Sequence, residues 1–234
     1  VNLAALDRED PPRSVLVAGA TDDTDSAGVS LALAEAAALD GTRTVLLESN
    51  LRNPTLALRA PLEPSPGLAD YLAGAATEEE IIQHLLLGSG EAPARGEPTD
   101  SDSDRRALAC IPAGAGPARA SELMQGPKLG ELCRLLAAAY ELVIVDAAPL
   151  LAVADPLRIA PHLDATLVCI HAREGSREQI RALASALEGP GTRPLGTVLT
   201  GLRPGDAGYD HYRGYTEPGV GPQRRPRLRS WASR

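Results

Sequence analysis

The sequence predicts an α/β fold with an open, doubly wound, mainly parallel sheet flanked by helices. Two observations carry this prediction. Short apolar runs of strand length alternate with Ala/Leu-rich helical patterns along most of the chain, and glycines, prolines and polar residues separate them. The 234 residues, of which 44% are hydrophobic, are enough for a full core in one large domain. We expect residues 1–203 to form that domain.

The first three elements set the expected topology. Ser14–Ala18 is an apolar, strand-length run, Val29–Leu39 is an Ala/Leu-rich helical segment, and Thr44–Leu47 is a second apolar run. A strand, a helix and a strand in this order form a βαβ unit, which implies that the two strands are parallel.

The middle of the chain predicts short helices and an insertion. Gly67–Gly74 indicates a short helix between glycines, and Thr77 is the expected N-cap of another helix with glutamates in its first turn. Residues 88–105 are rich in Gly, Pro, Ser and acids and lack apolar periodicity. This composition indicates a mobile insertion rather than a domain boundary.

The second half repeats the alternation of strands and helices. The predicted strands are Leu108–Ile111, Leu142–Asp146, Ala165–Ile170 and Leu195–Leu199. The predicted helices are Ser121–Tyr140 with a break near Pro127, Asp155–Ala160 and Ser176–Leu187. We expect residues 204–234 to be a disordered basic tail that carries Tyr209, Tyr212 and Tyr215.

Composition narrows the function classes. The net charge of -8 gives no general attraction to nucleic acid, so no nucleic-acid partner is expected. No apolar run reaches the roughly 18 to 20 residues that cross a bilayer. The 3 cysteines have neither CxxC nor Cys/His spacing, which indicates reduced thiols and predicts no metal site.

Three segments are expected at the carboxyl edge of the sheet, where ligands bind to open parallel sheets. They are the loop after Ala18, the segment Glu48–Pro54 and the segment Asp146–Pro149. Together they form the candidate site.

The order and spacing of these segments resemble the cytoplasmic domain of bacterial tyrosine kinases of the capsular and exopolysaccharide type. The resemblance covers nearly the whole chain and rests on Ser14–Thr21, Thr44–Pro54, Gly67–Gly74, Ile111–Gly114, Ser121–Met124, Tyr140–Pro149 and Val153–Leu157. It implies a P-loop NTPase-like fold of the deviant Walker class and a site for ATP and magnesium. It also implies that the tail tyrosines Tyr209, Tyr212 and Tyr215 are phosphorylation candidates.

The phosphate loop departs from the family pattern, which is Pro-Gly-Glu-Gly-Lys-Ser/Thr. Asp23 and Asp25 replace its glycines, Ser26 replaces its lysine, and Ala27 removes the hydroxyl that binds magnesium. A carboxylate about 5 Å from a phosphate charge costs roughly 3 kcal/mol at an effective dielectric of about 20. Several such groups, even half screened, offset most of the roughly 8 kcal/mol of a micromolar affinity. The sequence therefore predicts a degenerate Walker A motif.

The rest of the candidate site is altered as well. Glu48 and Asn50 replace two family aspartates, and Thr200 stands where the family has an asparagine that reads a purine edge. Asp146 keeps the Walker B carboxylate. The resemblance implies residual catalytic positions at Asp146 and Glu48. The implied cofactor-binding positions are Asp25, Ser26, Ala27, Asn50, Arg52 and Thr200.

The leading hypothesis is a catalytically impaired, tyrosine-kinase-like regulatory or scaffold domain in exopolysaccharide polymerisation and export, with no cofactor expected. The family implies a partner, fused or separate, in a membrane-spanning polysaccharide co-polymerase segment. A second copy of the chain or an active sibling kinase is a further partner class. The start at Val1, without Met or a signal pattern, indicates a fragment or a processed chain. Val1–Asp7 resembles the end of the helix that precedes the kinase core in the family, which implies a fragment of a longer membrane-anchored protein on the cytoplasmic side of the bacterial inner membrane.

Three alternatives stay open. The first is an active ATP-dependent tyrosine autokinase with an atypical phosphate loop, which would use ATP and magnesium. The second is a relative of the ParA/MinD ATPases, against which Leu51–Pro54 and the tail tyrosines argue. The third is calcium binding by Asp23–Gly28, against which Ala27 at a ligand position and Ala34 at the closing position argue.

Overall fold

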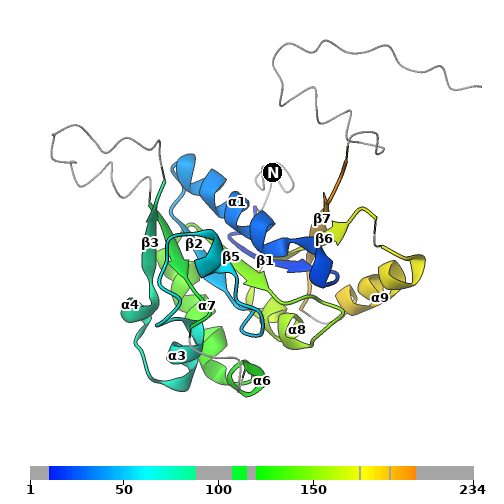
Figure 1. Ribbon diagram of the computed structural model, residues 1–234. Coiled ribbons are helices and arrows are strands. Elements are labelled where there is room, and N and C mark those ends of the chain that lie inside the picture. The colour runs from blue at the N-terminus through cyan, green and yellow to red at the C-terminus, as the bar shows by residue number, and fades with distance from the viewer. Residues whose placement is uncertain (1–10, 88–106, 115–119, 174, 190, 204–234) are drawn as a thin grey trace, which may run out of the picture. The chain divides into compact units, whose positions relative to one another are not determined.

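The computed structural model describes residues 11–87, 107–114, 120–173, 175–189 and 191–203 (Figure 1). The sheet and its helices lie in the first of two units, Val1–Thr200. The opening segment Val1–Asp7, the predicted insertion at 88–105 and the predicted tail with its three tyrosines lie outside the described residues. The predicted domain boundary at 203 stays a prediction.

A seven-stranded sheet forms the centre of the molecule, in the order β3-β4-β2-β5-β1-β6-β7. The strands are β1 Ser14–Gly19, β2 Thr44–Glu48, β3 Gln83–Leu86, β4 Ala107–Ile111, β5 Leu142–Ala147, β6 Ala165–His171 and β7 Pro194–Thr200. All neighbouring strands are parallel except β3 and β4, which are antiparallel. The predicted mainly parallel α/β sheet is confirmed.

The helices cover both faces of this sheet (Figure 1). They are α1 Ser26–Leu39, α2 Leu56–Arg59, α3 Leu68–Ala73, α4 Glu78–Ile81, α6 Ala120–Leu123, α7 Pro127–Ala139, α8 Asp155–Ile159 and α9 Arg177–Leu187. Short 3-10 turns occur at Asp22–Thr24 and Ala160–His162. The break predicted near Pro127 separates α6 from α7, because proline fits the first turn of a helix but not its interior.

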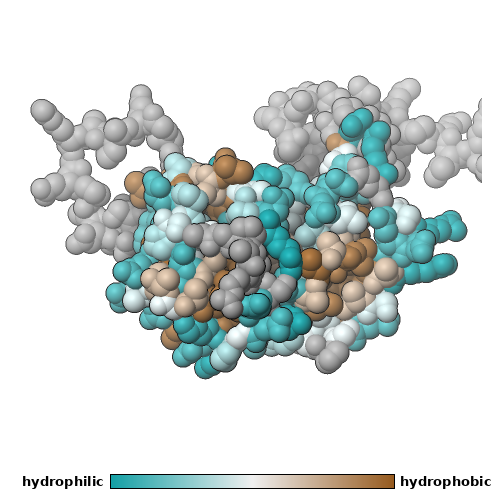
Figure 2. Space-filling view, turned by 60° about the horizontal axis from the view of Figure 1, so that its bottom comes forward, coloured by the Kyte–Doolittle hydropathy of each residue, from teal (hydrophilic) through white to brown (hydrophobic). Residues whose placement is uncertain are grey.

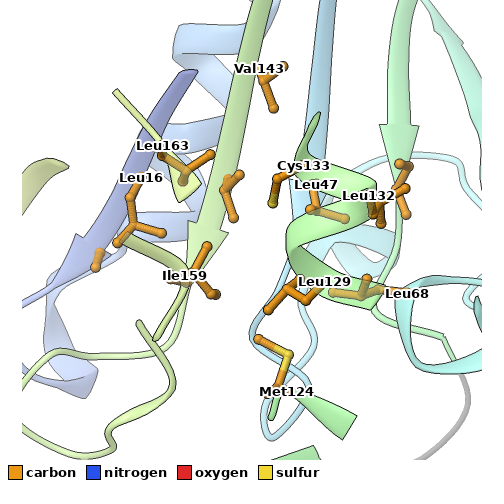
Figure 3. Packing of buried hydrophobic residues seen from close by; sticks show 14 of the residues in the cluster. Leu16, Leu47, Leu68, Met124, Leu129, Leu132, Cys133, Val143, Ile159 and Leu163 are labelled. Atoms are coloured by element: carbon orange, nitrogen blue, oxygen red, sulfur yellow. The ribbon is translucent and has the colours of Figure 1, made fainter. Parts of the chain in front are cut away.

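The core consists of two apolar layers, one on each face of the sheet. Successive residues of a strand point to opposite faces, so Leu16 belongs to one layer and its neighbours Val15 and Val17 to the other. In the first layer, Leu132 and Cys133 of α7 lie close to Leu47 of β2 (Figure 3). Helix α1 covers the second layer through Leu33, Ala34 and Ala38. Burial on both faces explains why the central strands are continuous apolar runs.

Two parts of the prediction differ from the structure. The helix expected from Thr77 has the predicted capping box, in which Thr77 Oγ1 accepts the Glu80 N–H at 3.4 Å, but it ends at Ile81 after a single turn. The chain then enters β3, which the sequence analysis did not predict. An edge strand needs one buried face only, and Gln83–Leu86 alternates half-buried with exposed residues, so it lacks the apolar run that marks the inner strands.

The surface is mixed in hydropathy (Figure 2), and the three cysteines are free, buried thiols. Hydrophilic residues cover much of the face in Figure 2, with apolar patches between them. Cys110, Cys133 and Cys169 are free and buried, and burial raises the pKa of each thiol, to about 12, 11 and 12 respectively. Within the described ranges, no helix is long and apolar enough to span a membrane.

Candidate nucleotide-site cleft

The loop after β1 folds into a tight turn around Thr24. Thr24 is buried, and its hydroxyl donates a hydrogen bond of 2.9 Å to the carbonyl of Thr21. A Cβ built on Gly19 would lie 1.9 Å from Thr24 Oγ1, so only glycine fits at the end of β1. With Thr24 turned inward, Asp22 and Asp23 are exposed on the outer side of the turn.

Thr200 holds this turn from the end of β7. Its hydroxyl donates a hydrogen bond of 2.9 Å to the carbonyl of Thr24. Sequence analysis placed Thr200 where a purine edge would be read. In the structure, this hydrogen bond makes Thr200 a support for the loop, and its position at a purine edge stays a prediction.

Asp25 connects the turn to α1 with a left-handed backbone, φ 48° and ψ 42°. This conformation suits glycine and is costly for most other residues. The loop therefore keeps the backbone of a glycine position while carrying a carboxylate. Ser26 and Ala27 follow in the first turn of α1, which begins earlier than the predicted Val29.

Arg59, the last residue of α2, reaches into the same region. Its Nη2 lies 2.6 Å from Asp25 Oδ1, and the two side chains are 38% and 58% exposed. Sequence analysis missed Arg59. Its only signal in the sequence is an arginine in the segment after the second strand, and its approach to the loop depends on how α2 is anchored.

Glu48 anchors α2. Its buried carboxylate accepts the N–H groups of Thr55 and Leu56, the latter at 2.8 Å, through Oε1. Oε2 accepts the N–H of Ala113 at 3.0 Å, from the segment after β4. The two oxygens of Glu48, which the sequence predicts as a residual catalytic position, thus accept three backbone N–H groups. These hydrogen bonds connect the end of β2, the start of α2 and the segment after β4.

Asp146 lies at the end of β5, beside Glu48 in the register of β2 and β5. It is 4% exposed, and Ser30 Oγ lies 3.0 Å from its Oδ1. Burial raises the pKa of Asp146 to about 7, and the charge of Glu48 adds to the rise while the hydrogen bond from Ser30 opposes it.

Asp25, Arg59 and Asp146 are among the residues that line a cleft of about 260 Å³. Of the predicted site residues, the structure brings Asp25, Ser26, Ala27, Asn50 and Asp146 to its walls, together with Asp22, Asp23, Asn53, Thr55 and Arg59 among others. Glu48, Arg52 and Thr200 are not among the lining residues. Arg52 Nε instead lies 3.3 Å from Asp155 Oδ2, on α8.

The lining of the cleft carries more acidic than basic side chains. Asp22, Asp23, Asp25 and Asp146 line it against one guanidinium, that of Arg59, which is already paired with Asp25. Ala27 has no oxygen to offer a metal. In the part of the chain that the structure describes, no group of three or more His, Cys, Asp or Glu residues is arranged to hold a metal ion.

Comparison with known sequences identifies relatives of this chain, although no family model matches it. The tyrosine-protein kinase YwqD of Bacillus subtilis is 25% identical over 203 residues, which cover 87% of this chain and 77% of YwqD. The putative tyrosine-protein kinase EpsB of Ralstonia solanacearum is 26% identical over 197 residues, which cover 84% of this chain but 24% of EpsB. The chain thus spans most of one relative and about a quarter of the other.

Comparison with solved structures agrees with these relatives. The VpsO kinase domain matches with a TM-score of 0.71 at 25% identity, over 86% of this chain and 90% of that one. The cell division ATPase MinD of Pyrococcus furiosus matches with a TM-score of 0.61 at 19% identity, which shows a shared fold alone. In sequence and in fold, this chain is a relative of the kinase domain of bacterial tyrosine kinases.

Proposed function

We propose that this chain is a catalytically impaired, kinase-like domain that acts as a regulator or scaffold in exopolysaccharide assembly. The observation that carries the proposal is the charge of the cleft. Its lining includes four aspartates, Asp22, Asp23, Asp25 and Asp146, and a single arginine that is already paired. A nucleotide brings several negative charges, and each ionised carboxylate within about 5 Å opposes it by roughly 3 kcal/mol at an effective dielectric of about 20. Burial raises the pKa of Asp146 to about 7, so Asp146 adds to this repulsion only in its ionised fraction.

The retained framework supports a binding role rather than loss of all function. Glu48, Thr200 and Thr24 still hold the loops around the cleft through hydrogen bonds of 2.8 to 3.0 Å. The fold also matches a kinase domain over most of its length. A domain with this shape and without nucleotide chemistry is suited to contact other components of the same assembly.

The membrane setting belongs to the same proposal. EpsB is about four times longer than the region it shares with this chain, since the match covers 24% of it. We place the chain beside a membrane-spanning co-polymerase segment, fused or separate, on the cytoplasmic side of the membrane. Co-purification of that segment with the chain from membranes tests this part of the proposal.

Isothermal titration of the chain with Mg-ATP tests the loss of nucleotide binding. We expect no heat of binding up to millimolar nucleotide. A variant with the family loop restored, Asp23→Gly, Asp25→Gly, Ser26→Lys and Ala27→Ser, is expected to bind Mg-ATP, since it regains the lysine and the metal-binding hydroxyl and loses two carboxylates. Micromolar binding by the unmodified chain would overturn the proposal.

An active autokinase is the competing function, and the name of one relative motivates it, since YwqD is a tyrosine-protein kinase. This function requires ATP and magnesium in the cleft and transfer to tyrosines such as Tyr209, Tyr212 or Tyr215. Incubation with Mg-ATP followed by an anti-phosphotyrosine blot distinguishes the two functions. A signal that disappears in Asp146→Asn would establish the kinase, whereas we expect no signal in either protein.

A further inference from the structure

The Asp25 carboxylate lies against the first turn of α1 without capping it. Asp25 immediately precedes the helix, yet its side chain makes no capping hydrogen bond to that turn. A Cβ built on Gly28 would come within 2.6 Å of Asp25 Oδ2 and 3.0 Å of Asp25 Oδ1. The carboxylate therefore occupies the space beside Gly28, next to N–H groups that have no acceptor within the helix.

A cation from a different element holds the carboxylate there. Arg59 comes from α2, and its Nη2 lies 2.6 Å from Asp25 Oδ1. Both residues line the cleft of about 260 Å³. Because the Arg59 and Asp25 side chains are 38% and 58% exposed, water reaches the ion pair, and Arg59 can exchange one anionic partner for another.

We infer that Asp25 is a built-in anion that occupies the cleft, and that Arg59 is the cation of a latent site for phosphate or polyphosphate. A guanidinium binds carboxylate and phosphate oxygens with the same fork of N–H donors. The start of a helix also favours either anion. Asp25 pairs its carboxylate with Arg59 and places it beside the first turn of α1, without a capping hydrogen bond. This inference rests on the proposed function, because it identifies the Asp25 carboxylate as the group that keeps a phosphate out of the cleft.

Asp25→Gly separates this inference from general charge repulsion. Glycine adopts the φ of 48° found at Asp25 at no steric cost, so the variant is expected to keep the loop backbone while it releases Arg59. Asp23→Gly is the matched control, since it removes the same charge from the same cleft and leaves the Asp25–Arg59 ion pair in place. Asp25→Asn is a second variant that breaks the ion pair with Arg59, because asparagine has no charge. Asparagine also tolerates the left-handed backbone of this position.

Isothermal titration with inorganic pyrophosphate, without metal and at low salt, measures the effect. We expect Asp25→Gly to bind at least about tenfold more tightly than the unmodified chain, with Asp25→Asn in the same direction. Asp23→Gly is expected to stay near the unmodified chain, and the double variant Asp25→Gly with Arg59→Gln is expected to lose the gain. Circular dichroism and urea unfolding verify that each variant is folded.

Several results would overturn the inference. Equal gains in Asp23→Gly and Asp25→Gly would assign the effect to net charge alone. No gain in Asp25→Gly or Asp25→Asn, or a gain that survives Arg59→Gln, would remove Arg59 from the site. These outcomes leave the proposed function standing, because none of them shows that the unmodified chain binds Mg-ATP.

Discussion

Two neighbouring carboxylates, Glu48 and Asp146, differ in the hydrogen-bond partners that surround them. They are register partners on adjacent parallel strands, and both are buried. Glu48 accepts three backbone N–H groups, which compensate its burial, whereas Asp146 has the hydroxyl of Ser30 at 3.0 Å. Burial consequently raises the pKa of Asp146 to about 7.

This difference predicts how Asp146 affects stability as the pH changes. An unfolded aspartate loses its proton near pH 4, whereas folded Asp146 keeps it to about pH 7. Between these values the folded state binds more protons, so the contribution of Asp146 to stability falls as the pH rises, by up to about 4 kcal/mol, and then stays constant. The asparagine in Asp146→Asn does not titrate, so this variant removes the loss of stability that Asp146 causes as the pH rises.

Urea unfolding at pH 4.5 to 8 measures the prediction. The free energy of unfolding of Asp146→Asn, relative to the unmodified chain, is expected to increase through this range and to level off above about pH 7. Asp22→Asn, which removes an exposed carboxylate of the same cleft, controls for the loss of one charge. A difference between Asp146→Asn and the unmodified chain that is independent of pH would contradict the assignment.

At the scale of elements, the loop after β1 is held by its packing against the end of β1 and by a hydrogen bond from β7. Gly19 ends β1 directly against Thr24, and Thr200 on β7 bonds to the carbonyl of Thr24. The end of the first strand, the loop and the last strand therefore form one unit. This unit fixes the backbone of Asp25 in the left-handed conformation, and the anchored α2 brings Arg59 to meet it.

Gly19→Ala is predicted to destabilise this unit. A Cβ at position 19 would lie 1.9 Å from Thr24 Oγ1 and 2.8 Å from the carbonyl oxygen of Thr21, so the loop must shift. Overpacking of this kind costs about 1 to 3 kcal/mol of unfolding free energy. Gly126→Ala is a matched control, because its Cβ would meet nothing closer than 3.7 Å and its φ of -76° suits alanine. Equal losses in both variants, measured by urea unfolding, would show that Gly19 is not confined by Thr24.

At the scale of the whole molecule, the fold was predictable where burial is complete. β1, β2 and β5 are buried along their entire length, so their sequences are continuous apolar runs with clear ends. β3 was not predictable, because an edge strand needs no such run. The segments of the site were predictable from their position after parallel strands, and Asp146 from the end of β5.

The roles of individual site residues were less predictable than their positions. The sequence predicts Glu48 and Thr200 as site residues, but their hydrogen bonds to backbone groups depend on three-dimensional contacts with Ala113 and Thr24. Arg59 could not be identified as a site residue, because nothing in the sequence around it indicates that α2 brings its side chain to Asp25. Long-range pairing of this kind appears only once the elements are packed.

The thermal unfolding midpoint of the 234-residue chain with and without about 1 mM Mg-ATP tests the central claim most directly. A ligand at about 100 times its dissociation constant stabilises a protein by roughly 2.7 kcal/mol, which raises the midpoint of a domain of this size by several degrees. We predict no change for the unmodified chain, because the cleft offers four aspartates and one paired arginine among its lining residues. A rise of several degrees with Mg-ATP would contradict the account.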